Sequence, residues 1–190
     1  MDTRNPALGG IRLVLGGNVF GWTADKDTSF AVLDAFIGAG FNAVDTADVY
    51  SRWAPGHQGG ESETVIGEWM KSRGNRDKVV LITKVGSEMP AGKGLKAAYI
   101  QSACEASLKR LQTDHIDLYQ LHRFDYETPL EESLRAFDDL IRQGKVNYIG
   151  FSEWTASQIG DALKIQKASG FDRFVSSQPQ YSALWRVIEA

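Results

Sequence analysis

The chain has 190 residues, of which 43% are hydrophobic and 24% charged, with a formal net charge of -3. This composition is typical of a globular protein with one sizeable core, and a slightly acidic chain offers no basic stripe for a phosphate backbone. No apolar run approaches the roughly 20 residues of a membrane span, so we expect neither nucleic acid nor membrane as a partner.

The chain begins with a polar, charged stretch at residues 1–10, which does not resemble a signal peptide. Beyond it, short β-branched or apolar runs predict six strands, at residues 13–15, 43–46, 79–84, 116–122, 148–151 and 174–177. Segments with helical periodicity separate every pair of these strands. Strands that alternate with helices in this way favour right-handed βαβ units and a parallel sheet, and therefore an α/β fold.

Capping patterns mark the start of some of these helices. Residues 128–131 (TPLE) predict a capping box with proline at the first helical position, and Thr155 with Gln158 predicts a second box. Cys104 falls on the apolar face of a helix, so we interpret it as a small buried hydrophobe rather than a nucleophile. A lone cysteine cannot form an internal disulfide, and a reducing, cytoplasmic setting is expected.

Two α/β architectures fit the alternation, an open doubly wound sheet and a closed (β/α)8 barrel. The doubly wound sheet predicts a G-x-G-x-x-G run between its first strand and a helix, whereas the glycine-rich residues 15–21 are followed by no immediate helix. A (β/α)8 barrel typically needs about 250 residues. A chain with six strands would therefore hold about six of its eight β/α units.

Polar side chains follow five successive predicted strands, where the loops of a barrel converge on one rim. They are Asp45 with Tyr50, Lys84, His122, Ser152 with Glu153, and Gln178. Each alone has an ordinary structural explanation, such as a turn cap, a solvated lysine or a core tyrosine with a satisfied hydroxyl. Gathered at one rim, these groups need a shared reason, and a functional site is the stronger interpretation.

Four motifs, in order along the chain, resemble the aldo-keto reductase superfamily. They are residues 44–50 (VDTADVY), 81–84 (LITK), 107–111 (SLKRL) with 116–122 (IDLYQLH), and 148–152 (YIGFS). The resemblance runs from about Arg12 to Ala190 and implies a (β/α)8 TIM barrel, with residues 1–190 as one domain that lacks the C-terminal part of the barrel. It also implies an oxidoreductase that reduces aldehydes or ketones with a nicotinamide cofactor.

The resemblance assigns the catalytic roles to Asp45, Tyr50, Lys84 and His122. Hydride from the reduced nicotinamide would reach the carbonyl carbon of the substrate while Tyr50 donates a proton to its oxygen. A nearby cation, Lys84, would stabilise the resulting tyrosinate, with Asp45 holding Lys84 in place. His122 would donate a hydrogen bond to the carbonyl oxygen.

The cofactor contacts that the resemblance implies come from Gly17, Asn18, Val19, Asp45, Ser152, Glu153 and Gln178. Position 153 departs from the family's asparagine, and an ionised glutamate has no donor for a carboxamide oxygen. The family's pyrophosphate and adenosine contacts follow the seventh and eighth strands, which lie beyond this sequence. NADPH (NADP+) is therefore expected from the family's habit, and NADH stays open.

A pocket for a small carbonyl substrate would be shaped by Trp22, Tyr50, Trp53, His122 and Arg123. Phe20 and Trp154 are further candidates, although ordinary loop packing explains such aromatic residues equally well.

Other interpretations remain beside the reductase. A regulatory barrel subunit that senses the cofactor, or an inactive fragment of a reductase, would keep the same motifs. A metal-dependent hydrolase is disfavoured, because His57, His115 and His122 are scattered rather than close together on one strand, and we expect no metal. If the molecule consisted of these six strands alone, the edges of the first and last strands would be exposed, and we would expect self-association through them or poor solubility.

Overall fold

The computed structural model describes residue 8 and residues 10–189. Within them, six strands form one sheet in the order β1-β2-β3-β4-β5-β6. The strands are β1 (Val14–Gly16), β2 (Ala43–Asp45), β3 (Val80–Val85), β4 (Ile116–Leu121), β5 (Val146–Ser152) and β6 (Ser176–Gln178). The α-helices are α2 (Lys26–Gly38), α3 (Glu61–Arg73), α4 (Ala97–Leu111), α5 (Leu130–Arg142) and α6 (Ala156–Ser169). Two short 3-10 helices, η1 (Arg76–Lys78) and η2 (Val187–Glu189), complete the described elements.

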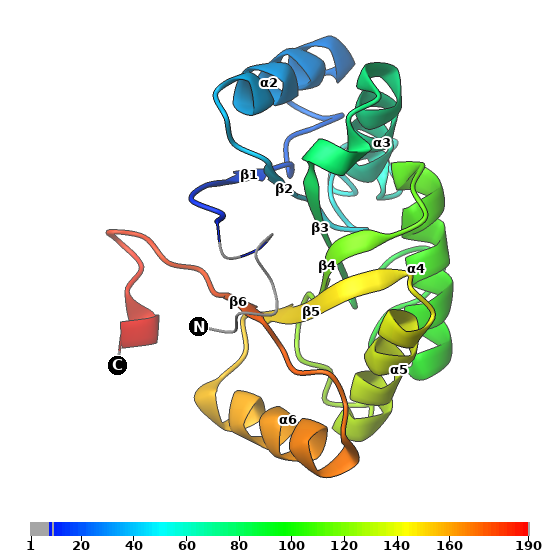
Figure 1. Ribbon diagram of the computed structural model, residues 1–190, viewed down its shortest axis with the longest axis vertical. Coiled ribbons are helices and arrows are strands. Elements are labelled where there is room, and N and C mark those ends of the chain that lie inside the picture. The colour runs from blue at the N-terminus through cyan, green and yellow to red at the C-terminus, as the bar shows by residue number, and fades with distance from the viewer. Residues whose placement is uncertain (1–7, 9, 190) are drawn as a thin grey trace.

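Every neighbouring pair of strands is parallel, and each strand pairs with the next one along the chain. A doubly wound sheet would reverse its strand order at a switch point, so this sequential order is that of a (β/α)8 barrel. Figure 1 shows helices α2 to α6 arranged as an arc outside the strands. The predicted α/β fold of about six β/α units is confirmed.

All six predicted strands are present, with ends that differ from the prediction by one or two residues. The largest extension is in β5, which begins at Val146 because that residue pairs with Ile116 at the start of β4. His122 lies just beyond β4, but its backbone N–H still donates to the Val85 carbonyl at 2.8 Å. The position of this side chain is therefore fixed by the strand ladder.

One of the two predicted capping boxes is present and the other is wrong. Thr155 and Gln158 form the reciprocal pair of hydrogen bonds at the start of α6. Thr128 does not cap α5, because Pro129 is the N-cap residue, without a side-chain hydrogen bond. Thr128 therefore lies one residue outside the N-cap, and its hydroxyl donates to Asp125 Oδ2 at 2.6 Å within the preceding loop.

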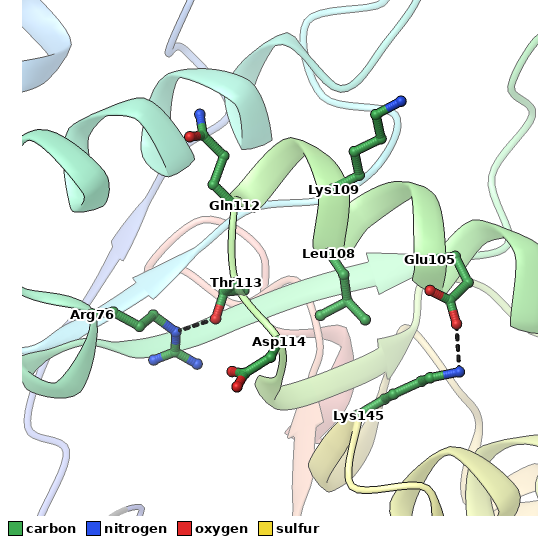
Figure 2. A pocket seen from close by; sticks show the side chains of 8 residues that line it. All are labelled: Arg76, Glu105, Leu108, Lys109, Gln112, Thr113, Asp114 and Lys145. Atoms are coloured by element: carbon green, nitrogen blue, oxygen red, sulfur yellow. Dashed lines mark hydrogen bonds and ion pairs between the residues drawn. The ribbon is translucent and has the colours of Figure 1, made fainter.

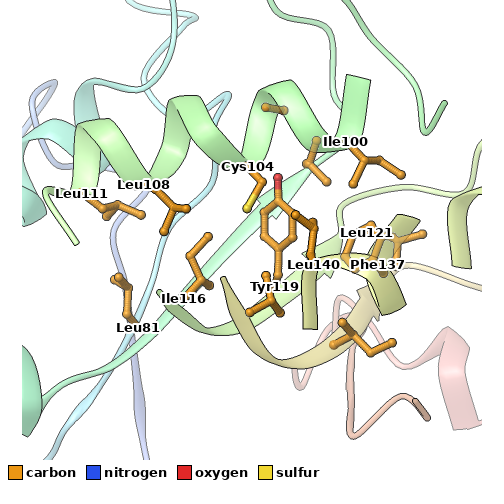
Figure 3. Packing of buried hydrophobic residues seen from close by; sticks show 14 of the residues in the cluster. Leu81, Ile100, Cys104, Leu108, Leu111, Ile116, Tyr119, Leu121, Phe137 and Leu140 are labelled. Carbon is orange, nitrogen blue, oxygen red and sulfur yellow. The ribbon is translucent and has the colours of Figure 1, made fainter. Parts of the chain in front are cut away.

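The main hydrophobic core lies between the strands and the helices. Figure 3 shows Tyr119 of β4 at the centre of this layer, and its ring stacks on Phe137 of α5 with the centroids 5.2 Å apart. Cys104 of α4 is fully buried in the same layer, as predicted. Burial raises the pKa of the Cys104 thiol to about 12, so the nucleophilic thiolate is disfavoured.

A second, smaller cluster of buried apolar side chains consists of Ala43, Val80, Ile82 and Leu118. These residues come from β2, β3 and β4, and the partly buried Tyr148 of β5 packs against them. Because neighbouring side chains along a strand point to opposite faces of a sheet, the two clusters cover its two faces. The strands are thus held from both sides, which fixes where their carboxyl ends lie.

Candidate active site

The carboxyl ends of the strands carry the polar residues that the sequence singles out. Asp45 is the last residue of β2, Lys84 lies one residue before the end of β3, and His122 directly follows β4. Ser152 ends β5 and Gln178 ends β6. In a parallel barrel sheet these ends meet at one rim, so five strands bring these side chains together.

Lys84 is the centre of the hydrogen bonding at this rim. Its ammonium group donates to Asp45 Oδ2 at 2.7 Å, to the Thr46 carbonyl at 2.8 Å and to the Tyr50 hydroxyl at 3.0 Å. These three acceptors match the three N–H donors of an ammonium group. Only 1% of the Lys84 side chain is exposed. A buried cation is stable only when it is paired and fully hydrogen-bonded, as Lys84 is here.

Asp45 supplies the negative charge that compensates Lys84. Burial raises the pKa of the Asp45 carboxyl, and the Lys84 ammonium opposes that rise. Among the described residues, the hydrogen bonds to the Asp45 carboxylate all go to Oδ2. The other oxygen, Oδ1, is buried and has no hydrogen-bond partner among the described residues. The site therefore offers an acceptor that a bound molecule can use.

Tyr50 lies in the loop after β2, and its neighbour fixes its place. Ser51 has a left-handed backbone (φ 72°) and is buried, and its hydroxyl donates to the Phe20 carbonyl at 2.9 Å. The Tyr50 ring meets the His122 ring edge-on, with centroids 5.8 Å apart. Because the Tyr50 oxygen accepts from Lys84, its own proton is left to be donated to a different partner.

His122 is a neutral imidazole at this rim. Burial lowers the pKa of His122 to about 3, and the positive charges of Lys84 and Arg123 add to that effect. At neutral pH the ring therefore carries one N–H, which can be on either nitrogen. Its Nδ1 atom lies 3.1 Å from the Ser87 hydroxyl oxygen, a neighbour that the sequence motifs do not point to.

A second residue outside the motifs' assigned roles is Gln120 of β4. Its amide nitrogen donates to Gln178 Oε1 at 2.7 Å, and Gln178 Nε2 lies 3.4 Å from Asp45 Oδ2. Gln120 is 1% exposed, and its Oε1 atom has no partner among the described residues. The only sequence signal is its spacing: it is two residues before His122, so it shares that face of the strand.

The loop after β1 contacts the rim through Gly17. The Gly17 N–H donates to the Asp45 carbonyl at 2.7 Å, and the Gly17 carbonyl accepts from the Ser62 hydroxyl at 2.7 Å. Gly17 is buried, Val19 is half-buried and Asn18 is exposed. The predicted cofactor loop thus reaches Asp45 through its backbone.

The residues after β5 divide between two tasks. Ser152 Oγ donates to the Gln178 carbonyl at 2.8 Å, which fastens β5 to β6. Glu153 has a left-handed backbone (φ 59°) and accepts from the Gln180 N–H with one oxygen. Its other oxygen lies 3.9 Å from Arg123 Nη1. Both Glu153 oxygens are therefore engaged in joining the loops after β4, β5 and β6.

Aromatic side chains continue outward from Tyr50. Trp53 lies 6.0 Å from the Tyr50 ring, and Trp22 meets Trp53 edge-on at 5.7 Å. Trp22 and Trp53 are 45% and 49% exposed, so both present surface to a ligand. Phe20 and Trp154, by contrast, are buried in the main core. Of the predicted pocket residues, Arg123 is exposed and directed at Glu153.

A surface hollow lies at the opposite end of the strands (Figure 2). It is lined by α4, by Arg76 of η1 and by the segments just before β4 and β5, and its charged side chains are largely paired. Arg76 donates to Thr113, and Lys145 pairs with Glu105. Because catalytic groups of barrels gather at the other end, this hollow is separate from the candidate site.

The three histidines do not gather. His57 contacts the Ser51 carbonyl, whereas His115 lies beside Asp114 just before β4. Among the residues that the structure describes, no three or more His, Cys, Asp or Glu side chains are grouped to hold a metal ion. None of the described helices is long and apolar enough to cross a membrane.

The chain is similar in sequence to known proteins over most of its length. Uncharacterized oxidoreductase YrpG of Bacillus subtilis (strain 168) is 40% identical over 186 residues, covering 94% of this chain and 56% of that protein. Aryl-alcohol dehydrogenase (NADP(+)) of Phanerodontia chrysosporium is 36% identical over 181 residues, 88% of this chain and 45% of that protein. Norsolorinic acid reductase B of Dothistroma septosporum is 36% identical over 174 residues, 86% and 42% of the two chains.

The chain spans about half the length of these three relatives. The model of the aldo/keto reductase family matches residues 12–190, which include every strand of the sheet. Because this match covers nearly the whole chain, the chain belongs to the aldo/keto reductase family.

Proposed function

We propose that the protein is an oxidoreductase that reduces aldehydes or ketones to alcohols, with a reduced nicotinamide nucleotide as hydride donor and Tyr50 as general acid. The observation that carries this proposal is the contact between Lys84 Nζ and both Asp45 and the Tyr50 hydroxyl. The names of the relatives, an oxidoreductase, an aryl-alcohol dehydrogenase and a reductase, support the same class of reaction.

Tyr50 has the hydrogen bonding that a proton donor needs. Reduction of a carbonyl by hydride leaves negative charge on oxygen, and that oxygen must receive one proton. The Tyr50 oxygen accepts from Lys84 at 3.0 Å, so its O–H is free to point at a substrate. After the proton leaves, the tyrosinate charge faces the Lys84 ammonium, which stabilises it in a buried setting.

His122 complements Tyr50 as a hydrogen-bond donor. A neutral ring can donate to the carbonyl oxygen as charge develops there, without itself losing a proton. The low pKa of His122, about 3, keeps the ring neutral at the pH of a cell. An imidazolium at this place would compete with Tyr50 as the acid, and burial beside Lys84 prevents it.

The residues at the rim fit a nicotinamide nucleotide. The buried acceptors Asp45 Oδ1 and Gln120 Oε1 are without partners among the described residues, and hydroxyl and amide donors of such a nucleotide would satisfy them. Ser152, Gln178 and the backbone of the loop from Gly17 to Val19 are the other candidates to hold it. When bound, the dihydronicotinamide supplies the hydride. NADPH is our choice, and NADP(+) in the name of the Phanerodontia chrysosporium relative supports it.

The test is product formation by the chain. We expect NADPH to be consumed with nitrobenzaldehyde and the corresponding nitrobenzyl alcohol to be identified by chromatography, with NADH assayed in parallel. Binding of NADPH without alcohol from any of a series of aldehydes and ketones would contradict the reductase and support a cofactor-sensing subunit. Failure to bind either nucleotide would contradict the cofactor assignment itself.

A further inference from the structure

We propose that Ser87 is a positioning residue that decides which ring nitrogen of His122 carries the proton. Ser87 follows β3 and lies three residues after Lys84. Its hydroxyl oxygen is 3.1 Å from His122 Nδ1, and both side chains are partly buried. The purpose of this contact rests on the proposed reductase function, but the contact itself does not.

The backbone before Ser87 is shaped to make this approach. Gly86 has a φ of 117°, a conformation that residues with a side chain rarely adopt. A Cβ at Gly86 would lie 2.8 Å from Leu95 Cδ2, so no larger residue fits there without movement. In addition, Val85 accepts the backbone N–H of His122 at 2.8 Å. The end of β3 therefore holds His122 by its backbone through Val85 and by its ring through Ser87.

A neutral imidazole ring has two tautomers, and the contact between Ser87 and His122 Nδ1 bears on which of them forms. Such a ring has one N–H and one bare nitrogen, and whichever nitrogen accepts a hydrogen bond is the bare one. If the Ser87 O–H donates to Nδ1, the proton is on Nε2, and Nε2–H can donate to a substrate carbonyl. With the proton on Nδ1, Nε2 would present a lone pair to the carbonyl oxygen and repel it.

A doubly protonated His122 ring would have a donor on each nitrogen, and its orientation toward a carbonyl would then not depend on a tautomer. Burial lowers the pKa of His122, and the charges of Lys84 and Arg123 add to this, so the ring is neutral and one nitrogen is bare. Within the described residues, the hydrogen bond to Ser87 is the one that the His122 ring makes to a side chain. Because the Ser87 hydroxyl can either donate to Nδ1 or accept from Nδ1–H, the direction of this one hydrogen bond corresponds to the tautomer of His122.

The decisive experiment is nitrogen NMR of the histidine rings of the full chain, which distinguishes protonated from bare ring nitrogens. His122 is assigned by loss of its signals in His122→Gln, which leaves His57 and His115. We expect wild type to hold the proton on Nε2, Ser87→Ala to give a mixture of tautomers, and Ser87→Thr to restore the wild-type spectrum. Ser102→Ala, on the exposed face of α4, is the matched control and should change nothing.

The proposal is overturned if wild type carries the proton on Nδ1, or if Ser87→Ala leaves the tautomer unchanged. Kinetics give a second measurement on the same variants: kcat should fall about tenfold in Ser87→Ala, with the KM for NADPH unchanged and Ser87→Thr near wild type. A loss in KM alone would indicate a merely structural role. Because the NMR result does not require turnover, it stands apart from failure of the proposed reductase activity.

Discussion

At the residue scale, one buried ion pair organises the site. Lys84 and Asp45 have side chains that are 1% and 5% exposed, and Lys84 contacts Tyr50 as well. Charges taken out of water are tolerated when they compensate each other, and the remaining partner becomes costly when one of them is removed. Lys84, which donates a hydrogen bond to the Tyr50 hydroxyl, thus also stabilises the fold through its ion pair with Asp45.

Replacement of Lys84 by methionine should therefore affect both properties. Lys84→Met leaves the Asp45 carboxylate buried without its cation, and we expect the free energy of unfolding to fall by about 3–5 kcal/mol. The double variant Asp45→Asn with Lys84→Met should recover much of that loss, because no uncompensated charge remains. Urea unfolding measures both. Equal destabilisation of the single and double variants would contradict the role of the unpaired charge.

Asp48 predicts a pH dependence of stability. Both of its carboxylate oxygens are buried without a partner among the described residues. Burial raises the pKa of Asp48 from 3.8 to about 8, and the nearby Glu63 carboxylate adds to the rise. The native state therefore holds a proton that the unfolded chain releases, so this stability is complete below the unfolded pKa and is lost as the pH rises through about 8.

The variant Asp48→Asn removes this titration. Its unfolding free energy, relative to wild type, should increase between about pH 5 and about pH 8, because wild type alone loses stability over that range. Asp77→Asn, in the exposed η1, is the control and should track wild type. A constant difference between Asp48→Asn and wild type at all pH values would show that Asp48 does not titrate in this range.

A residue of the site can be predicted from the sequence when it follows a predicted strand or lies in one of the four motifs. Asp45, Lys84, His122 and Ser152 can be identified because strand ends in a barrel converge and the four motifs contain them, and Gln178 because it follows a predicted strand. Ser87 lies outside the motifs, and Gln120 lies inside one without an assigned role: a serine in a loop and a glutamine inside a strand are common. Their roles follow from distances of 3.1 Å and 2.7 Å to particular atoms, which only the folded chain defines.

At the element scale, the close approach of α3 and α4 depends on a single glycine. A Cβ on Gly67 of α3 would lie 2.3 Å from the backbone carbonyl oxygen of Arg110 in α4. Backbone atoms cannot move aside as a flexible side chain can. The two helices are also tied by Arg110, whose Nε donates to the fully buried Glu63 at 2.6 Å.

Two glycine-to-alanine substitutions test this contact. Alanine normally stabilises a helix interior, and Gly160→Ala in α6, where a Cβ would meet nothing within 4 Å, should raise stability by about 0.5–1 kcal/mol. Gly67→Ala should instead lower it by about 1–3 kcal/mol, because the helices must separate. Thermal unfolding of the two variants measures the contrast. If both changed stability in the same direction, close packing of α3 and α4 would not be the cause.

Local signals predicted most element boundaries, and the failure at α5 shows their limit. Thr155 caps α6 as its sequence implies, with its side-chain oxygen accepting from the Gln158 N–H. Thr128 has the same pattern, but Asp125 is within 2.6 Å of its hydroxyl. Asp125 also accepts the backbone N–H of Leu95 at 2.7 Å, from a segment 30 residues away. A contact of that range is absent from any local motif.

At the scale of the whole molecule, the sheet is an arc with two edges. Within the part of the chain that the structure describes, β1 pairs with β2 alone and β6 pairs with β5 alone. The sequential order of the strands follows from the alternation of strands and helices and was predictable, as were the convergent strand ends. The curvature that brings Gln178 of β6 within 3.4 Å of Asp45 of β2 is set by packing on both faces and is known only from the structure.

When the 190-residue chain is produced by itself, its two sheet edges predict association. Unpaired backbone groups along β1 and β6 can pair with another strand, and Val175 and Tyr181 beside β6 expose 44% and 58% of their surface. We expect the sedimentation coefficient of the chain to rise with protein concentration. A sedimentation coefficient that stays at the value of a monomer over a roughly hundredfold range of concentration would contradict this expectation.

If Tyr50 donates the proton in a carbonyl reduction organised by Lys84, removal of its hydroxyl alone should remove most of the turnover. Tyr50→Phe keeps the ring and removes only the hydroxyl that Lys84 contacts, while Tyr99→Phe on α4 removes a hydroxyl that is not among the three acceptors of Lys84. With NADPH and nitrobenzaldehyde, we expect kcat to fall about a hundredfold to ten-thousandfold in Tyr50→Phe and to be unchanged in Tyr99→Phe. Turnover of Tyr50→Phe close to that of wild type would contradict this role of Tyr50.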